Sequence, residues 1–203
     1  MSSQFALLHT RRFLPFFITQ FLGAFNDNLF KNALVVLLTF KAAGWTTLRP
    51  EVLTNLAAGV FILPFFLFSA TAGQLADKHD KALLARLVKL LEMAIMGVAA
   101  LGFWQQGLVL LLTALFLLGC HSTLFGPVKY AILPQHLRED ELVGGNALIE
   151  AGTFVSILIG TLSGGLLAGV VAHPVWIALG GLVVAVAGYV SSRSIPSAPP
   201  PEP

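Results

Sequence analysis

Residues 13–40 read FLPFFITQFLGAFNDNLFKNALVVLLTF, an apolar run interrupted near its middle by Asn26, Asp27 and Asn28 and then by Lys31. At a rise of about 1.5 Å per residue, a helix over this run is long enough to cross a bilayer with some tilt. Asp27 then falls near the bilayer midplane, where an isolated carboxylate costs about 2.5 kcal/mol or more. The sequence therefore predicts that Asp27 is functional and that it pairs, takes up a proton or faces water.

The residues around Asp27 predict a polar face on this helix. Lys31 follows Asp27 by four residues, about 40° around a helix, in the acid-before-base order that favours an ion pair. Gln20 and Gly23 fall within about 40° of Asp27 by the same spacing. We expect this face to line a cavity, and the clustered asparagines favour that interpretation. The alternative is a buried ion pair that only locks the helix to its neighbours.

The composition is that of an integral membrane protein. Mean hydropathy is +0.83, 56% of the residues are hydrophobic and only 11% are charged, whereas soluble domains approach about 25% charged residues. The net charge of +2 is small and scattered, and no basic cluster predicts nucleic-acid binding. The single cysteine, Cys120, lies in an apolar stretch and is interpreted as a packing residue.

Six stretches are predicted to span the membrane, in up-and-down order. Each has about the length needed to cross 30 Å of hydrocarbon, and the first is too long for a removable signal peptide. The spans are expected at 13–40, 52–72, 82–104, 108–125, 146–171 and 174–190, which together make a bundle over residues 1–193. The five prolines of Ser194–Pro203 predict a linker or tail.

The basic residues predict the orientation. A cytoplasmic N-terminus places eight of the twelve Lys and Arg residues on or near the cytoplasmic side: Arg11, Arg12, Lys78, Lys81, Arg86, Lys89, Arg138 and Arg193. Because cytoplasmic loops carry an excess of such residues, both termini are expected in the cytoplasm.

Several small residues and one proline predict how the helices pack. Pro64 is expected to kink the second span. Small residues recur every four positions in the fifth span and let neighbouring helices approach closely. They form two stripes: Ser156, Gly160 and Gly164, and Thr161, Gly165 and Gly169.

Residues 73–81, between the second and third spans, read GQLADKHDK. A glycine, a short spacer, an aspartate and a basic run at this place resemble the cytoplasmic signature of the major facilitator superfamily. The resemblance covers essentially the whole chain and implies a gate that uses Gly73, Asp77, Lys78 and Lys81. The sequence departs from the pattern at Asp80, where a glycine is usual.

Three further segments narrow the resemblance. They are GAFNDN at 23–28, FGPVKYAILP at 125–134 and GNALIEAGT at 145–153. Together they resemble the bacterial lysophospholipid transporter family, including versions fused to an acyltransferase and acyl-carrier-protein synthetase. The resemblance implies a flippase of lysophospholipid in the bacterial inner membrane, in which Asp27 and Lys129 are functional polar residues.

A zwitterionic lysophosphatidylethanolamine offers an ammonium and a phosphate to such residues. Asp27 or Glu150 is expected to take the amine, and Lys129 or Lys31 the phosphate, with Gln20 and Asn28 beside them. Each candidate has an alternative. Lys129 follows a Gly-Pro break, and in the alternative interpretation its side chain only extends to the cytoplasmic surface. Glu150 lies near the start of the fifth span, and in the alternative interpretation its negative charge only stabilises the N-terminus of that helix.

Two other polar residues within the spans have mainly structural interpretations. Glu92 follows Lys89 by three residues and is expected to form a structural pair with it. His121 is expected to pack through a hydrogen bond, with proton transfer as the alternative.

The sequence gives little support for enzyme chemistry. It contains no His-x-x-x-x-Asp acyltransferase pattern, no phosphate-binding loop, no Gly-x-Ser-x-Gly elbow and no metal-type grouping of His and Cys. Neither a cofactor nor a metal is expected, and no nucleotide-binding motif indicates use of ATP.

The resemblance implies that the chain supplies one half of a transporter, because transporters of this superfamily have two six-helix halves around a midplane site. The expected partner is a C-terminal half in the same, longer polypeptide, and the alternative is a second copy. Two rival functions stay open: transport of another small molecule, and a membrane anchor for an acyltransferase.

Overall fold

The computed structural model describes residues 4–200 and is all-helical, with no β-strand in that range. Its six long helices are α1 (Leu14–Phe40), α2 (Pro50–Lys78), α3 (Lys81–Gln105), α4 (Leu108–His136), α5 (Glu139–Val170) and α6 (Val175–Ser192). Two 3-10 helices, η1 (Gln4–His9) and η2 (Ala42–Gly44), flank α1. The predicted all-α, six-helix fold is confirmed.

Five of the long helices, α2 to α6, are long and apolar enough to cross a membrane. The remaining one, α1, has 27 residues and so the length for a span, but its central polar residues lower its hydropathy. Those same polar residues are largely buried inside the bundle rather than turned outward. The bundle therefore shelters the one helix that lipid would accept least readily.

Several helices extend beyond the limits that hydropathy suggested. α2 continues to Lys78, α4 continues to His136, and α5 already begins at Glu139. The break expected at Gly126-Pro127 is wrong, because Pro127 lies inside α4. A proline removes one backbone hydrogen bond, but the turns on either side of Pro127 remain helical, so α4 continues past it.

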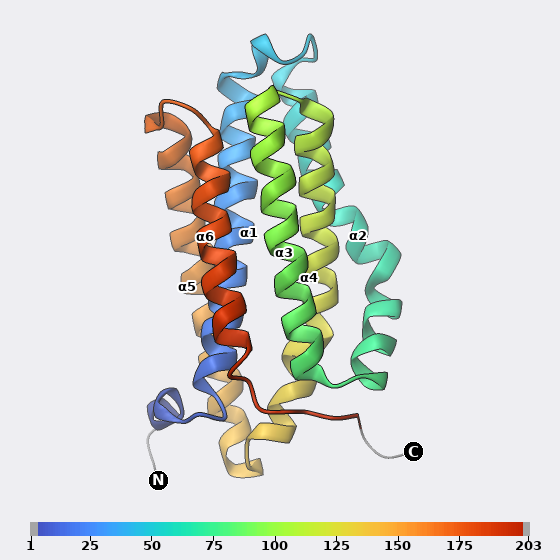
Figure 1. Cartoon of the computed structure of the whole chain (residues 1–203), viewed down its shortest axis with the longest axis vertical. Coiled ribbons are helices and arrows are strands. Elements are labelled where there is room, and N and C mark those ends of the chain that lie inside the picture. The colour runs from blue at the N-terminus through green and yellow to red at the C-terminus, as the bar shows by residue number, and fades with distance from the viewer. Residues whose placement is uncertain (1–3, 201–203) are drawn as a thin grey trace.

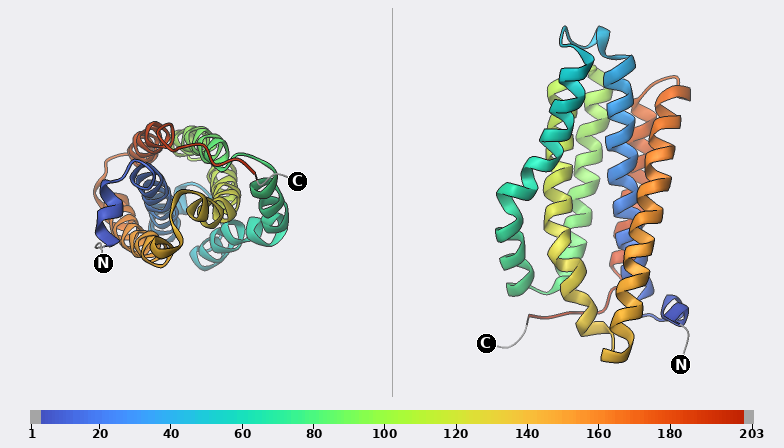
Figure 2. Two further views of the ribbon diagram at one scale, coloured as in Figure 1. Left: turned by 90° about the horizontal axis from the view of Figure 1, so that it is seen from below. Right: turned by 180° about the vertical axis from the view of Figure 1, so that it is seen from behind.

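The helices form two groups that meet along the centre of the molecule. α1 packs mainly against α5 and α6, while α4 packs against α2 and α3, and contacts between α3 and α6 join the two groups (Figures 1 and 2). α1 therefore lies where residues from α3, α4 and α5 can reach its polar face. Both ends of the described chain lie at the same end of the bundle (Figure 1).

One of the two predicted small-residue stripes packs against α1. A Cβ at Gly160 would lie 2.5 Å from the carbonyl oxygen of Phe25, and one at Gly164 would collide with the carbonyl oxygen of Leu29. The absence of side chains thus allows the backbones of α1 and α5 to touch. In the second stripe Thr161 accepts a hydrogen bond from Asn32 of α1, but the prediction is wrong for Gly165 and Gly169, which have nothing within 4 Å of a Cβ position.

α2 changes direction near its middle, and its C-terminal half leans away from α4 (Figures 1 and 2). Pro64 lies inside this helix, as the sequence predicted, and explains the kink. Gly119 of α4 faces the bend: a Cβ there would lie 3.0 Å from the Pro64 ring and would collide with the carbonyl oxygen of Phe61. The glycine lets α4 pack directly against the kinked turn.

Candidate functional site

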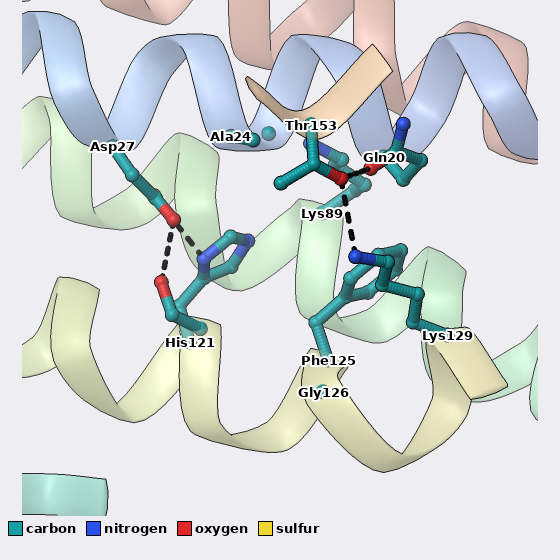
Figure 3. Close-up of a pocket in the computed structure, with 11 residues that line it drawn as sticks. Gln20, Ala24, Asp27, Lys89, His121, Phe125, Gly126, Lys129 and Thr153 are labelled. Atoms are coloured by element: carbon teal, nitrogen blue, oxygen red, sulfur yellow. Dashed lines mark hydrogen bonds and ion pairs between the residues drawn. The ribbon is translucent and has the colours of Figure 1, made fainter. Parts of the chain in front are cut away.

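A cavity of about 130 Å³ lies between α1, α3, α4 and α5 (Figure 3). Its apolar lining includes Phe125, and its polar lining comes from all four helices. The polar residues are Gln20 and Asp27 from α1, Lys89 from α3, His121, Ser122 and Lys129 from α4, and Thr153 from α5. The predicted cavity beside Asp27 is therefore present, and it brings together residues far apart in sequence.

Asp27 faces α4 at one end of the cavity. The hydroxyl of Ser122 donates a hydrogen bond to its Oδ2, and Nδ1 of His121 lies 3.5 Å from its Oδ1 (Figure 3). The residue is 9% exposed and lines the cavity, so its carboxylate is sheltered from lipid but faces a polar space.

The predicted ion pair between Asp27 and Lys31 is wrong. The Lys31 ammonium instead lies 4.9 Å from the ring centroid of Phe61 on α2, in a cation–π arrangement. Asp27 turns instead to Ser122 and His121 of α4, so the two side chains contact different helices. Because Lys31 points toward α2, it does not line the cavity.

Glu92 anchors a charge network behind the cavity and is 0% exposed. The Lys89 ammonium lies 2.6 Å from its Oε2, Asn26 donates to its Oε1 at 2.6 Å, and Nε2 of His121 lies 3.2 Å from its Oε2. The structural pair predicted between Lys89 and Glu92 is therefore confirmed. Its wider role as a bridge between α1, α3 and α4 was not predicted.

Two glycines make room for the buried ammonium of Lys89. A Cβ at Gly23 of α1 would lie 2.8 Å from Nζ of Lys89, and one at Gly188 of α6 would lie 3.1 Å from it. Lys89 is 1% exposed, so it has little freedom to move away. Gly23, expected on the polar face, serves there to admit a charged side chain from α3.

The other end of the cavity is cationic. The Lys129 ammonium lies 2.7 Å from Oε1 of Glu150 and donates to the Thr153 hydroxyl at 3.1 Å. Thr153 lies within hydrogen-bonding distance, 3.0 Å, of Oε1 of Gln20, so Gln20, Thr153 and Lys129 form a chain across three helices (Figure 3). The Lys129 side chain is 12% exposed, whereas that of Glu150 is 40% exposed.

The remaining predicted binding residues lie outside the cavity lining. Asn28 donates to the carbonyl oxygen of Ala24, and its Cβ lies close to Gly160 of α5, so it packs between helices. Glu150 reaches the site only through Lys129 and also accepts a hydrogen bond from Tyr130 at 2.9 Å. The cavity thus keeps three of the six predicted residues: Gln20, Asp27 and Lys129.

Four polar lining residues, Lys89, His121, Ser122 and Thr153, were not among the predicted binding residues. His121 and Ser122 stand together in the apolar run of α4, and that isolated polar pair was the available signal. Thr153 follows Glu150 by three residues, almost one helical turn, which places it beside the predicted residue and nearer the cavity.

The segment that resembles a gate straddles the turn between α2 and α3. Gly73, Asp77 and Lys78 lie in the last two turns of α2, where Asp77 and Lys78 are exposed, and Lys81 begins α3. Lys81 is 2% exposed, and its backbone N–H donates to the carbonyl oxygen of Ala198. The gating role of these residues stays a prediction.

Asp80 joins this turn to the C-terminal segment. Its carboxylate caps α3 by accepting from the backbone N–H of Leu83 at 2.9 Å, and it also accepts from the Ser197 hydroxyl and the Ala198 N–H. Burial raises the pKa of this carboxyl, but the hydrogen bonds that it accepts outweigh burial and lower the pKa below its usual value. An aspartate here thus has a clear structural role.

The geometry suits a ligand that carries both charges. The carboxylate of Asp27 lies at one end of the cavity and the ammonium of Lys129 toward the other, where the Phe125 ring lies beside it (Figure 3). Charge-assisted hydrogen bonds to such groups are about twice as strong as neutral ones.

Comparison with known proteins gives one family and a consistent set of relatives. The Major Facilitator Superfamily matches residues 16–203. Relatives named lysophospholipid transporter LplT include one from Escherichia fergusonii, 33% identical over 87% of this chain and 41% of its own length. Those from Cronobacter sakazakii and Salmonella heidelberg are each 30% identical, over 92% and 88% of this chain and 43% and 40% of their own lengths. The chain thus spans about two fifths of these relatives.

Proposed function

The chain belongs to the Major Facilitator Superfamily, and we propose that it forms the N-terminal half of a transporter that moves a lysophospholipid across a membrane. The observation that carries the proposal is the cavity of about 130 Å³ with Asp27 and Lys129 in its lining. The substrate class is that of the relatives named lysophospholipid transporter LplT.

The cavity favours one of the assignments that the sequence left open. Asp27 is proposed to bind the ammonium of lysophosphatidylethanolamine and Lys129 its phosphate, because both line the cavity whereas Lys31 and Glu150 do not. Thr153 and Gln20 are proposed to hold Lys129 in place. On binding, the phosphate takes the place of Glu150, which is the more exposed partner of Lys129.

The size of the cavity supports a half-transporter. Sites for small molecules usually enclose about 300–1,000 Å³, so this space holds at most part of a lipid headgroup. Transporters of this kind bind substrate between two six-helix halves. We therefore propose that a C-terminal half supplies the opposite wall, from the same polypeptide or, in the alternative, from a second copy. An acyltransferase, if one is involved, is then a fused domain or a separate partner.

The distribution of charge supports an orientation in the bacterial inner membrane. The N-terminal ends of α1, α3 and α5 and the C-terminal end of α6 share one end of the bundle with both ends of the described chain, whereas the connection from α1 to α2 lies at the other (Figure 1). Arg12, Lys81, Arg138 and Arg193 are at or next to the first set of helix ends, and Lys41 and Arg49 are in that connection. Because basic residues concentrate on the cytoplasmic side, we propose that both termini are cytoplasmic.

Binding of lysophosphatidylethanolamine to the detergent-solubilised chain, measured by calorimetry, tests the proposed site. Asp27→Asn and Lys129→Gln are each expected to weaken binding at least ten-fold, the effect of losing a charge-assisted hydrogen bond worth about 1.5–3 kcal/mol. Glu51→Gln is the control, because Glu51 is exposed at the start of α2. Equal binding by all four proteins, or none by the unchanged chain, contradicts the proposal.

Transport distinguishes the proposed function from its rivals. Liposomes that hold only residues 1–203 are expected to move a fluorescent lysophosphatidylethanolamine more slowly than vesicles with both halves, and equal rates would show that one half suffices. Unrelated polar solutes should not compete with the lipid if the substrate class is right. If the chain is only a membrane anchor, Asp27→Asn leaves the activity of the assembled system unchanged.

A further inference from the structure

The imidazole of His121 lies between two carboxylates deep in the bundle. Its Nδ1 is 3.5 Å from Oδ1 of Asp27, and its Nε2 is 3.2 Å from Oε2 of Glu92. His121 is 2% exposed and Glu92 0%. Both contacts are of ion-pair length without the alignment of a hydrogen bond, and neither ring nitrogen has a hydrogen-bond partner in the structure. We call Asp27, His121 and Glu92 the His121 triad.

This arrangement requires one proton more than a neutral histidine carries. A neutral imidazole has one N–H and one lone pair, and ionised carboxylates only accept hydrogen bonds. A neutral ring would therefore turn its lone pair toward one of the two carboxylates, whereas an imidazolium presents an N–H to each. If the extra proton lies on one of the two carboxylates instead of on the ring, the number of protons that the triad holds is the same.

The charges around the triad lead to the same count. Among the described residues, Lys89 from α3 is the cation within ion-pair distance of Glu92. No Lys or Arg of that part of the chain is within ion-pair distance of Asp27, because Lys31, which interacts with Asp27 only at longer range, turns to Phe61 of α2. At ion-pair distance, two carboxylates therefore face one fixed cation when His121 is neutral. No further cation faces His121 from α2, whose ionisable residues Glu51, Asp77 and Lys78 all lie at its ends. Ser122 and Asn26 contribute only neutral donors to the carboxylates.

We propose that the His121 triad binds one exchangeable proton and that a substrate ammonium bound at Asp27 displaces it. The second part rests on the proposed function. When the ammonium pairs with Asp27, an N–H bond of the imidazolium breaks, its electron pair stays on the nitrogen, and the proton passes to water in the cavity. One positive charge replaces another, so the buried charge is unchanged. The neutral ring then keeps its N–H toward Glu92 and its lone pair toward Asp27 and the bound ammonium.

The proposal makes the site an exchanger of a proton for an amine-bearing headgroup. Asp27 and His121 both line the cavity, so the proton and the headgroup compete for a shared carboxylate. Glu92 does not take part in the exchange, because Lys89 and Asn26 already hold it. A headgroup without an amine leaves the proton in place.

The proton site can be tested without any lipid. In the chain with ¹⁵N-labelled histidine, the signals lost in His121→Gln identify its ring, which we expect to be protonated at both nitrogens at pH 7. In Asp27→Asn the amide can donate as well as accept, so the ring should lose one of its two protons. A ring with a single proton at pH 7, in a chain where infrared spectroscopy shows that both Asp27 and Glu92 are ionised, would overturn the proposal.

The exchange is tested by counting protons. Addition of lysophosphatidylethanolamine to the chain in weakly buffered detergent is expected to release one proton per lipid bound. The Kd of the lipid should therefore fall about ten-fold for each unit by which the pH rises, over the range in which the triad is protonated. Lysophosphatidylglycerol, which has no amine, should release none. His121→Gln should abolish the release, and His9→Gln, at an exposed histidine, should preserve it.

The possible failures are separable. Binding of the amine lipid without proton release overturns the exchange, even if the ring carries two protons. No binding of either lipid contradicts the proposed function, and the histidine spectra then decide alone whether the triad holds its proton.

Discussion

Lys89 provides the buried positive charge on which the arrangement of Glu92 depends. Its ammonium passes between Gly23 and Gly188 and contacts the carboxylate at 2.6 Å, with 1% of its side chain exposed. Burying an ion pair costs desolvation free energy, and removing one partner destabilises the protein further because the other charge stays buried without a partner. Gly23 and Gly188 leave the space that the Lys89 ammonium occupies.

The substitution Lys89→Met should destabilise the chain by about 3–5 kcal/mol, because it removes the nearest cation from the fully buried carboxylate of Glu92. Thermal unfolding in detergent measures the effect. Lys78→Met is the matched control, since Lys78 is exposed at the end of α2, and its effect should stay within about 0.5 kcal/mol. Similar losses in the two variants would contradict the assignment.

Arg12 and Glu141 join the segment before α1 to the first turn of α5. Both nitrogens of the Arg12 fork contact the carboxylate, each at 2.6 Å. The side-chain hydrogen bond from Arg12 is the main cause that lowers the pKa of Glu141 from 4.5 to about 2, with a further contribution from the backbone N–H of Arg138. The charged carboxylate is thus bound more favourably in the folded chain than in the unfolded one.

Because the folded-state pKa of Glu141 is depressed, the pair contributes its full stability above pH 4.5 and loses it as the pH falls toward about 2. A double-mutant cycle of Arg12→Gln and Glu141→Gln, followed by thermal unfolding, should therefore give a favourable coupling at pH 6. The coupling should shrink steadily between pH 4.5 and 2. A coupling that does not depend on pH over this range would show that the pair is not ionic.

At the scale of elements, hydropathy predicted six long helices but not where those helices end. The thickness of the bilayer's hydrocarbon region sets the length of an apolar stretch, whereas a helix continues wherever its backbone hydrogen bonds persist. α4 accordingly passes through Pro127 and reaches His136, and α5 starts within the acidic turn at Glu139. The Pro64 kink was predictable, because proline acts on its own helix.

The two glycine stripes of α5 show what a single sequence leaves open. Both have the spacing of a packing surface, yet the glycines of the first stripe, Gly160 and Gly164, touch α1, while Gly165 and Gly169 of the second have nothing within 4 Å of a Cβ position. Spacing identifies the faces of a helix, but the rotation of that helix in the bundle decides which face is covered. That rotation depends on contacts with other helices.

Gly164→Val and Gly165→Val form a matched pair of variants on adjacent residues. Valine at 164 would collide with the backbone of α1 at Leu29, so we expect a loss of at least 1–3 kcal/mol, the usual effect of overpacking. Valine at 165 has open space and should change stability by about 0.5 kcal/mol or less. Thermal unfolding of both in one detergent tests this, and equal effects would contradict the contact between α1 and α5.

At the scale of the molecule, the candidate site was predictable in its anchors but not in its connections. Asp27, Gln20 and Lys129 were predicted and do line one cavity, because charged residues within apolar spans must face a polar interior. Their partners were not predictable, since Asp27 meets His121 across 94 positions of sequence and Lys31 turns to Phe61. Such pairs depend on how the helices are rotated and packed.

The segment after α6 ties the two sides of the bundle together. Residues 194–200 run beneath the helices, with Ile195 and Ala198 buried, and Arg86 donates to the carbonyl oxygen of Ile195 at 3.1 Å (Figures 1 and 2). Asp80 holds Ser197 and Ala198 while it caps α3. If a C-terminal half follows, as proposed, this anchor sets the place from which that half starts.

Asp80→Ala should release this segment while the bundle itself stays folded. The Ala198 N–H loses a hydrogen bond to a charged carboxylate, worth about 1.5–3 kcal/mol, so its amide exchange should accelerate at least ten-fold. Because the pKa of Asp80 is lowered, the unchanged protein should keep this protection down to pH 3.8, its ordinary value. Hydrogen exchange of the peptide that contains residues 194–200, read by mass spectrometry, measures both effects.

Asp77→Ala, at an exposed carboxylate three residues earlier, should leave the exchange unchanged. Equal exchange in the two variants would mean that the segment is held by its apolar contacts at Ile195 and Ala198 alone.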